Sequence, residues 1–214
     1  MRALFPLIMA ACLAISVFAS PDASADFPVV RRPGFVAAHA ALPGGRRAET
    51  NAVIIVVSVA DQALALISGD EVLHVYRVST AVAGVGSKPN SEKTPLGWHR
   101  VAEWIGGDAV PGQVFVSRKP VAGEILRHTQ WRGDGGRDYV LTRILWLDGL
   151  EYGRNRGPGV DSHSRFIYIH GTNQEHLLGR PASHGCIRLS NHDVMAVYAL
   201  TEGRPTYVEI VDRF

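Results

Sequence analysis

The sequence predicts a mainly β domain, sandwich-like or barrel-like, with one α-helix in its C-terminal half. Short apolar runs dominate the chain from residue 52 onward, and Gly, Asp and Ser separate them. Runs of this length between turn residues are typical of strands. The helix is predicted to follow Ser190, a good N-cap residue, because apolar residues then recur at helical spacing until Gly203 and Pro205 end the pattern.

Several short runs share this strand pattern, and they lie at 52–59, 63–67, 71–79, 98–102, 113–117, 140–147, 165–170 and 206–211. Tight turns join the first of them, which favours neighbouring antiparallel strands. The runs are spread over one continuous segment without an internal repeat. We therefore expect a mostly antiparallel sheet that forms a single domain.

Two stretches, 102–112 and 118–138, are irregular and contain several glycines. Long loops within a compact domain are often functional, so we expect one or both stretches to form a lid or a groove wall. They carry Trp104 and Trp131, which are expected at exposed positions, either in that wall or over a satellite core.

Residues 1–25 are predicted to be a secretory signal peptide. An apolar run from 3 to 19 follows Arg2, and residues 23–25 are the small residues Ala, Ser and Ala that a signal peptidase requires. Cleavage there would start the mature chain at Asp26. The sequence therefore predicts an exported protein of the periplasm or cell envelope.

Two other interpretations of this segment are weaker. The apolar run is shorter than the roughly 20 residues that a membrane-spanning helix needs. Lipidation of Cys12 is disfavoured because the apolar run continues past it. Residues 26–51, rich in Pro, Ala, Gly and Arg, are predicted to be a leader or linker, and residues 52–212 to be the folded domain.

The charge pattern excludes one broad class of function. The formal net charge is only +2, and the basic residues are scattered along the chain. No stretch has the run of basic residues that follows a phosphate backbone, so nucleic acid is not an expected partner. No sequence pattern fixes an oligomeric state.

Cys186 is the cysteine that remains once the predicted signal peptide is removed, since the chain has 2 cysteines and the other is Cys12. An unpaired thiol in an oxidising compartment is a liability unless its reactivity is used. A free thiol has a pKa of about 8.5, so near neutral pH a neighbouring imidazole must take its proton to make a strong nucleophile.

Two histidines, His170 and His184, are candidates for this base. His184 is separated from Cys186 by one residue, and in an extended segment both side chains would project to one face. Gly185 also permits a tight bend, in which successive backbone N–H groups turn toward one point as an oxyanion hole requires. Such a bend leaves His170 free as the base, at a predicted strand end where Gly171 permits a sharp turn.

The same residues resemble a known family motif. His170-Gly171 precedes Ser183-His184-Gly185-Cys186-Ile187-Arg188, and the spacing from Gly171 through Ala182 is twelve residues. This pattern is similar to that of the L,D-transpeptidases of bacterial peptidoglycan, the YkuD group, and Lys93-Thr94-Pro95-Leu96-Gly97 resembles an upstream part of their domain. The resemblance covers 52–212 and implies a mainly β L,D-transpeptidase catalytic domain. The stretch 106–159 departs from the shortest family members.

The resemblance implies a role for each residue of the motif. Cys186 would be the nucleophile and His170 its general base, with the carbonyl of Gly171 orienting the imidazole. The backbone of 184–186 would stabilise the tetrahedral oxyanion, and Ser183 would support the site by hydrogen bonding.

The resemblance also implies a substrate class. The family attacks the bond between the L-centre of diaminopimelate and the terminal D-alanine of a tetrapeptide stem, releases D-alanine, and passes the acyl group to an amine. The partners would be peptidoglycan stem peptides and an amine acceptor, which is a second stem, a lipoprotein lysine or a free D-amino acid. Arg188, Arg165 and Asn173 are expected to contact substrate, and Arg188 is equally suited to holding the turn. No metal or cofactor is implied.

Other functions stay open at this point. A hydrolytic member of the same family shares the acyl-enzyme and differs only in the second nucleophile. A wall-binding module could bind stems without reacting, although the intact motif disfavours it. A zinc site drawn from His170, His176, His184 and Cys186 matches no common ligand spacing. A thiol oxidoreductase would normally show Cys-x-x-Cys, which the sequence lacks. If neither residue takes part in chemistry, Cys186 is an inert buried thiol and His170 is a histidine with satisfied hydrogen bonds at a strand end.

Overall fold

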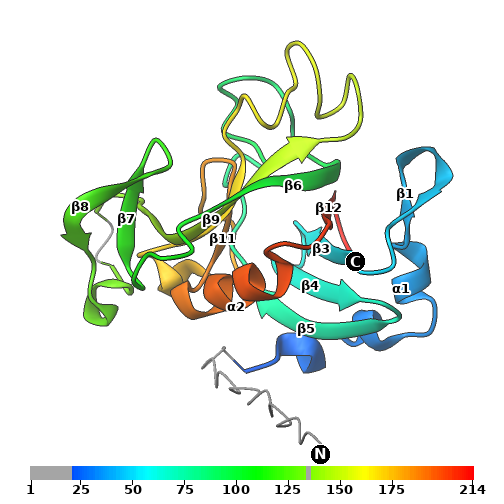
Figure 1. Ribbon diagram of the computed structural model, residues 1–214, viewed down its shortest axis with the longest axis horizontal. Helices are drawn as coiled ribbons and strands as arrows, with labels where there is room; N and C mark the ends of the chain where they lie inside the picture. Colours follow the sequence, from blue (N-terminus) through cyan, green and yellow to red (C-terminus); the bar gives the residue numbers. More distant parts are fainter. Residues whose placement is uncertain (1–20, 134–135) are drawn as a thin grey trace, which may run out of the picture.

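The computed structural model describes residues 21–133 and 136–214 (Figure 1). The strands are β1 (Ala41–Leu42), β2 (Arg46–Arg47), β3 (Val53–Ser58), β4 (Ala63–Ser68), β5 (Glu71–Arg77), β6 (Gly97–Ile105), β7 (Gln113–Val116), β8 (Lys119–Ile125), β9 (Val140–Gly149), β10 (Tyr168–Gly171), β11 (Ile187–Leu189) and β12 (Thr206–Val211). The α-helices are α1 (Phe35–Ala38) and α2 (Asn191–Thr201). Short 3₁₀ helices are η1 (Ala23–Asp26), η2 (Pro28–Arg31), η3 (Pro43–Gly45), η4 (His128–Gln130) and η5 (Glu175–Leu177).

One large sheet organises the described chain, in the strand order β11-β10-β9-β6-β12-β3-β4-β5. The hairpin of β7 and β8 joins this sheet through β9, and it projects from one end of the molecule (Figure 1). Most neighbouring strands are antiparallel, while β10 with β11 and β12 with β3 are parallel. The predicted mainly β fold is confirmed, as an open sheet with end strands β11 and β5.

Strand β3 is apolar without alternation because both of its faces are covered. Ile55 belongs to an inner core that includes Val194 and Val197 of helix α2. Its neighbour Val56 belongs to an outer core that includes Phe35 of the leader. A strand buried on both sides loses the polar alternation that marks a half-exposed strand.

Helix α2 begins where the sequence predicts. The Ser190 hydroxyl accepts a hydrogen bond from the Asp193 amide at 3.0 Å, which satisfies one of the unpaired N–H groups at the helix start. The helix packs its apolar side against β9, β10 and β11. It thereby fixes the end of the sheet where the His-Gly and Ser-His-Gly-Cys motifs lie.

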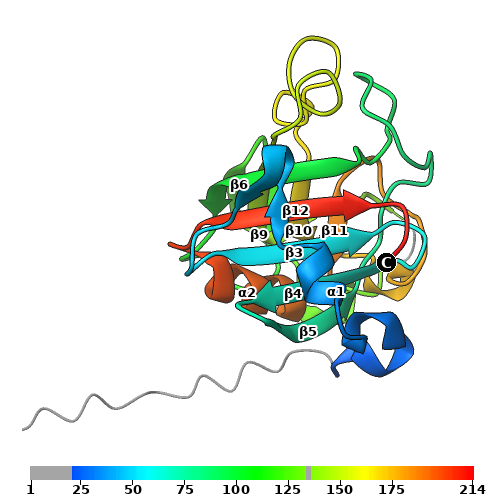
Figure 2. The same cartoon turned by 90° about the vertical axis from the view of Figure 1, so that its right-hand side faces the viewer.

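The leader segment 26–51 covers the outer face of the sheet (Figure 2). Val30, Phe35 and Leu42 are buried there. Composition indicates a linker, but these spaced apolar residues have a partner in the outward side chains of β3, β4 and β5. Most of the predicted signal peptide, including Cys12, lies outside the described residues.

Two expectations about the irregular stretches are wrong. Strand β8 lies within 118–138, because Lys119 pairs with Val116 and closes a hairpin. Trp131 is 4% exposed, and Trp104 is half-buried with its indole N–H donating to the Thr201 hydroxyl at 3.0 Å. Both tryptophans therefore pack as core, since apolar neighbours from other elements surround them.

Among the described residues, no helix has both the length and the apolar character needed to span a membrane.

Candidate active site

The parallel pairing of β10 and β11 brings the two motifs together. Ile169 pairs with Ile187, so Cys186, one residue earlier, lies beside Tyr168. The Tyr168 amide donates a hydrogen bond to the Cys186 Sγ at 3.4 Å. Side chains alternate along a strand, so Tyr168 and His170 share one face. Cys186 packs against the cluster on that face, which includes Tyr168, and thiol and imidazole therefore lie on the same side of the sheet.

The His170 imidazole is buried and held in one tautomer. Its Nδ1 lies 2.8 Å from the Gly171 carbonyl oxygen, which can only accept, so Nδ1 carries the proton. Burial lowers the pKa of His170, partly offset by the Asp138 carboxylate. The ring is therefore neutral near pH 7, with an unprotonated Nε2 that can accept a proton.

The Cys186 thiol is half-buried and also donates toward the Phe166 carbonyl, with a sulfur–oxygen distance of 3.4 Å. Burial raises the pKa of the thiol to about 11. Both groups are thus neutral in the resting site. An attack by this sulfur would require the thiol proton to leave, which is the situation that a general base serves.

Hydrogen bonds from Ser183 hold the turn at residues 183–186. The Ser183 hydroxyl donates to the Cys186 carbonyl at 2.6 Å and accepts from the Gly185 amide at 3.3 Å. The Thr94 hydroxyl donates to the Gly185 carbonyl at 3.0 Å. Gly185 has a φ of 125°, a conformation that side-chain-bearing residues rarely adopt. The bend predicted at this glycine is present in the structure.

Gly171 serves close packing instead of a sharp turn, which corrects the expectation from sequence. A Cβ at this position would lie 2.6 Å from the Asn191 Oδ1 and 2.8 Å from the Leu141 carbonyl oxygen. The pairing of β10 with β9 shifts register between His170 and Gly171. A glycine lets the backbone approach its neighbours closely while its carbonyl orients His170.

Arg188 is fully buried behind the turn. Its guanidinium donates to the Asp138 carboxylate at 3.0 Å, the Gln174 side-chain oxygen at 2.7 Å and the Ser79 hydroxyl at 3.0 Å. The Asp138 carboxylate also lies 3.4 Å from the His184 ring, whose side chain is exposed. These contacts fit the turn-holding alternative for Arg188.

Asp138 is a site residue that the sequence did not indicate. It lies just before β9, at the end of an irregular stretch, and no local motif distinguishes it from other loop acids. Its position between Arg188 and His184 arises only when the loop folds back over the turn. Sequence reasoning could find it only by asking which acid neutralises a buried Arg188.

The two other predicted substrate contacts, Arg165 and Asn173, both bind backbone groups of the protein. Arg165 is half-buried and donates to the Lys93 carbonyl at 2.7 Å, and its charge favours the thiolate form of Cys186. Asn173 is 5% exposed, and its side chain accepts from the Tyr139 amide at 3.0 Å and donates to the Arg137 carbonyl at 2.9 Å. Asn173 thus anchors the backbone that follows residue 136.

A group of aromatic residues lines the other side of Cys186, and sequence reasoning missed it. This aromatic wall consists of Trp146, Phe166 and Tyr168. Arg118 lies over two of its rings, 4.4 Å from the Trp146 centroid and 4.8 Å from the Phe166 centroid. The wall combines residues from β9, β10 and a loop, so only the folded chain brings them together.

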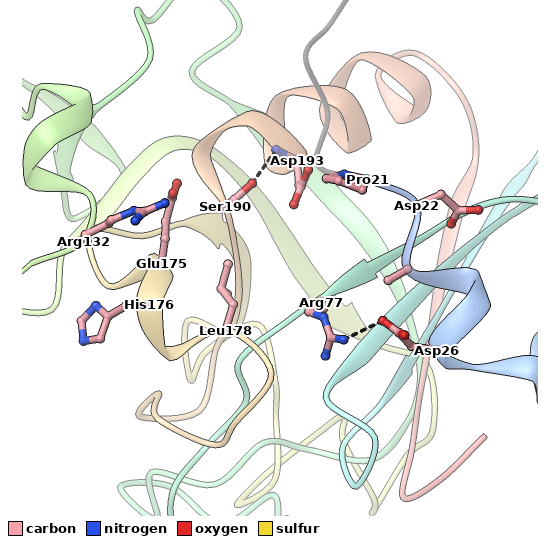
Figure 3. A pocket seen from close by; sticks show the side chains of 11 residues that line it. Pro21, Asp22, Asp26, Arg77, Arg132, Glu175, His176, Leu178, Ser190 and Asp193 are labelled. Atoms are coloured by element: carbon pink, nitrogen blue, oxygen red, sulfur yellow. Dashed lines mark hydrogen bonds and ion pairs between the residues drawn. The ribbon is translucent and has the colours of Figure 1, made fainter.

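A separate cavity of about 510 Å³ lies near η1 and η5 (Figure 3). Arg77 and Asp26, which form an ion pair at 2.6 Å, belong to its wall together with His176. Neither Cys186 nor His170 lines it. Among residues 21–133 and 136–214, no group of three or more His, Cys, Asp or Glu side chains is placed to hold a metal ion.

Comparisons with known proteins point to one family. The family model described as the L,D-transpeptidase catalytic domain matches residues 52–210. No curated protein sequence is significantly similar to this chain.

Solved structures with a similar chain path include several L,D-transpeptidases. The complex of LdtMt1 with imipenem has 18% identity and a TM-score of 0.43, covering 74% of this chain and 58% of that one. The L,D-transpeptidase from Mycobacterium smegmatis has 14% identity and a TM-score of 0.44, covering 78% and 64%. The helical cell shape determining protein Pgp2 from Campylobacter jejuni has 16% identity and a TM-score of 0.42, covering 76% and 48%.

This chain thus spans less than two thirds of the length of these structures. The family match covers most of the chain, including Cys186 and the strand that carries His170. The protein belongs to the family that is defined by the L,D-transpeptidase catalytic domain.

Proposed function

We propose that the protein is a cysteine L,D-transpeptidase that acts on the tetrapeptide stems of peptidoglycan. The observation that carries this proposal is the pairing of a neutral imidazole, fixed through Nδ1 on the Gly171 carbonyl, with the Cys186 thiol on the same sheet face. A thiol on the same face as an oriented base is the arrangement from which covalent acyl transfer can proceed. The family assignment supplies the substrate class.

In the first half-reaction, the Cys186 sulfur attacks the carbonyl carbon at the L-centre of diaminopimelate. An S–C bond forms, the C–N bond to D-alanine breaks, and the thiol proton passes through His170 Nε2 to the departing amine. In the second half-reaction, an acceptor amine attacks the thioester. The C–N bond forms, the S–C bond breaks, and the amine proton returns to sulfur through His170.

Both half-reactions place a negative charge on the carbonyl oxygen, which needs hydrogen-bond donors. We assign this role to the backbone amides of His184 and Cys186. The Gly185 amide is already directed at the Ser183 hydroxyl, with a distance of 3.3 Å. Fixed amides at a rigid turn stabilise an oxyanion without reorganising during the reaction.

The proposed setting is the periplasm or cell envelope, where peptidoglycan stems occur. The predicted signal peptide at 1–25 and the family match agree with export. The acceptor is a second stem, a lipoprotein lysine or a free D-amino acid. No step in this chemistry needs a metal or a cofactor.

The test is the mass of the products after incubation with purified disaccharide-tetrapeptide, with and without an added D-amino acid. A cross-linked dimer or an exchanged stem would support transfer, and Cys186→Ala should form neither. A shortened tripeptide alone would replace transfer with hydrolysis. A stem that binds and stays intact would favour a wall-binding module, and loss of turnover with a chelator would favour zinc chemistry.

A further inference from the structure

The β7–β8 hairpin ends in a turn that its sequence does not favour. Val116 pairs with Lys119, so Ser117 and Arg118 are the two central residues of the turn. Both have positive φ, 47° and 67°. Glycine and asparagine are the residues that usually occupy such a turn, because a side chain there adds strain. The geometry of the turn therefore does not explain why an arginine occupies position 118.

The contacts of Arg118 lie toward the catalytic centre. Its guanidinium stacks over the Trp146 and Phe166 rings, and one nitrogen, Nη1, donates to the Tyr168 hydroxyl at 3.1 Å. A guanidinium has five N–H donors. Within the described chain this is the single hydrogen bond that the guanidinium makes, and the side chain is half-buried. The remaining N–H donors of Arg118 can bind a planar anion, because the aromatic rings hold the guanidinium in place.

Tyr168 connects this guanidinium to the nucleophile. Its hydroxyl accepts from Arg118, and its backbone amide donates to the Cys186 Sγ. One residue thus spans from the thiol to the cation. Because Tyr168 contacts both groups, a substrate carboxylate that reaches Arg118 would belong to a part of the acyl donor close to the reacting carbonyl.

We propose that Arg118 is a specificity-determining residue that binds a free carboxylate of the acyl donor. This inference rests on the proposed function, since it names the part of the stem that the site selects. The stem offers two such groups, the carboxylate on the D-centre of diaminopimelate and the terminal carboxylate of D-alanine. Both are planar anions of the kind that a guanidinium binds through two parallel hydrogen bonds.

The test measures binding and turnover separately. Binding of synthetic stem tetrapeptides is measured by calorimetry in the full chain carrying Cys186→Ala, so that no reaction intervenes. The probes are the stem with both carboxylates free, the stem amidated at the D-centre of diaminopimelate, and the stem with a terminal D-alanine amide. Arg118→Gln removes the charge without changing the strain of the turn. Lys119→Gln removes a neighbouring exposed charge from the same hairpin and is the matched control.

We expect the free stem to bind about 10- to 100-fold more tightly than one of the two amidated stems, the range for losing a hydrogen-bonded charge partner. Arg118→Gln should abolish this preference, and Lys119→Gln should keep it. The amidated stem that loses affinity identifies the carboxylate. Equal binding of all three stems, no binding of any stem, or a preference that survives in Arg118→Gln would overturn the proposal.

Circular dichroism and thermal unfolding check that the variants fold. If Arg118→Gln does not fold, Arg118→Lys serves instead, since it keeps the charge but loses the two-pronged geometry and should weaken the preference. Release of D-alanine is measured in parallel with Cys186 intact. No release despite a carboxylate preference in binding would end the transpeptidase proposal and leave the role of Arg118 standing. Release that is equally fast from all three stems would support the transpeptidase proposal and contradict the role of Arg118.

Discussion

On one side of Cys186 the turn at residues 183–186 is held by hydrogen bonds from several directions, whereas on the other side the β7–β8 hairpin reaches the site through the Arg118 side chain. The turn side has Ser183 bonded within the turn, Thr94 bonded to Gly185, and Arg188 fully buried behind it. The hairpin side contributes Arg118, whose side chain is half-buried. The backbone of Ser117 and Arg118 at the hairpin tip has positive φ and is strained.

The two sides of Cys186 have different proposed tasks, bond making on the turn side and substrate selection on the hairpin side. Groups that must be placed accurately for bond making lie on buried, hydrogen-bonded backbone, where little can move. Arg118, the residue proposed to select a carboxylate, lies on a hairpin whose tip can vary without disturbing the sheet. We therefore expect substitutions on the turn side to change rate or stability strongly, and substitutions on the hairpin side to change selectivity with small effects on stability.

The largest effect is expected from the base. His170→Ala should slow acylation of Cys186 about 10²- to 10⁴-fold, the usual contribution of a general base. The measurement is the single-turnover rate of acylation by a carbapenem, a reagent class that the family resemblance makes suitable. His176→Ala, which alters an exposed histidine outside the site, is the control. His184→Ala should have a smaller effect, and the opposite ranking of His170 and His184 would mean that their roles are exchanged.

The next effect is expected from the buried ion pair. Asp138→Ala leaves the Arg188 charge buried without its carboxylate partner and should lower the free energy of unfolding by about 3 kcal/mol. Urea unfolding measures the change. Arg100→Gln breaks an exposed pair with Asp148 and should cost less than about 1 kcal/mol. Equal costs for the two variants would show that the turn side is no more tightly built than the surface.

Gly171→Ala should destabilise the protein by about 2 kcal/mol, within the range for overpacking a close contact. The added methyl group meets the Leu141 carbonyl, which belongs to β9 and cannot swing away as a side chain could. Thermal unfolding gives the stability, and the acylation rate reports whether the His170 imidazole has moved. An unchanged melting temperature would contradict the close packing at this glycine.

The smallest effect is expected at the hairpin tip, with the opposite sign. Ser117→Gly should stabilise the protein by about 1 kcal/mol or less, since glycine adopts a positive φ without strain. The acylation rate of Cys186 should not change. A clear loss of stability would mean that the Ser117 side chain supports the turn. The hairpin side would then resemble the turn side in its sensitivity to substitution.

The sequence predicts those parts of the site that lie within one motif. The bend at Gly185, the α2 cap at Ser190 and the strand carrying His170 follow from local residue types, because each depends on a few neighbouring residues. The family pattern adds the pairing of His170 with Cys186, which lie far apart in the chain.

The remaining features depend on tertiary packing. Asp138 and the aromatic wall come from separate loops and strands, and only the sheet order brings them to Cys186. The packing of the leader was missed because its apolar residues have no regular period. Gly171 was expected to permit a turn, since the crowding by Leu141 across the sheet has no local sequence signal.

Intact-protein mass spectrometry with peptide mapping shows whether Cys186 forms the acyl-enzyme. The protein is incubated with a carbapenem and, separately, with stem tetrapeptide, beside Cys186→Ala. We predict one adduct per chain, located on Cys186 and absent from a folded Cys186→Ala variant. An unmodified Cys186 after long incubation, or turnover by the alanine variant, would show that Cys186 is not the nucleophile.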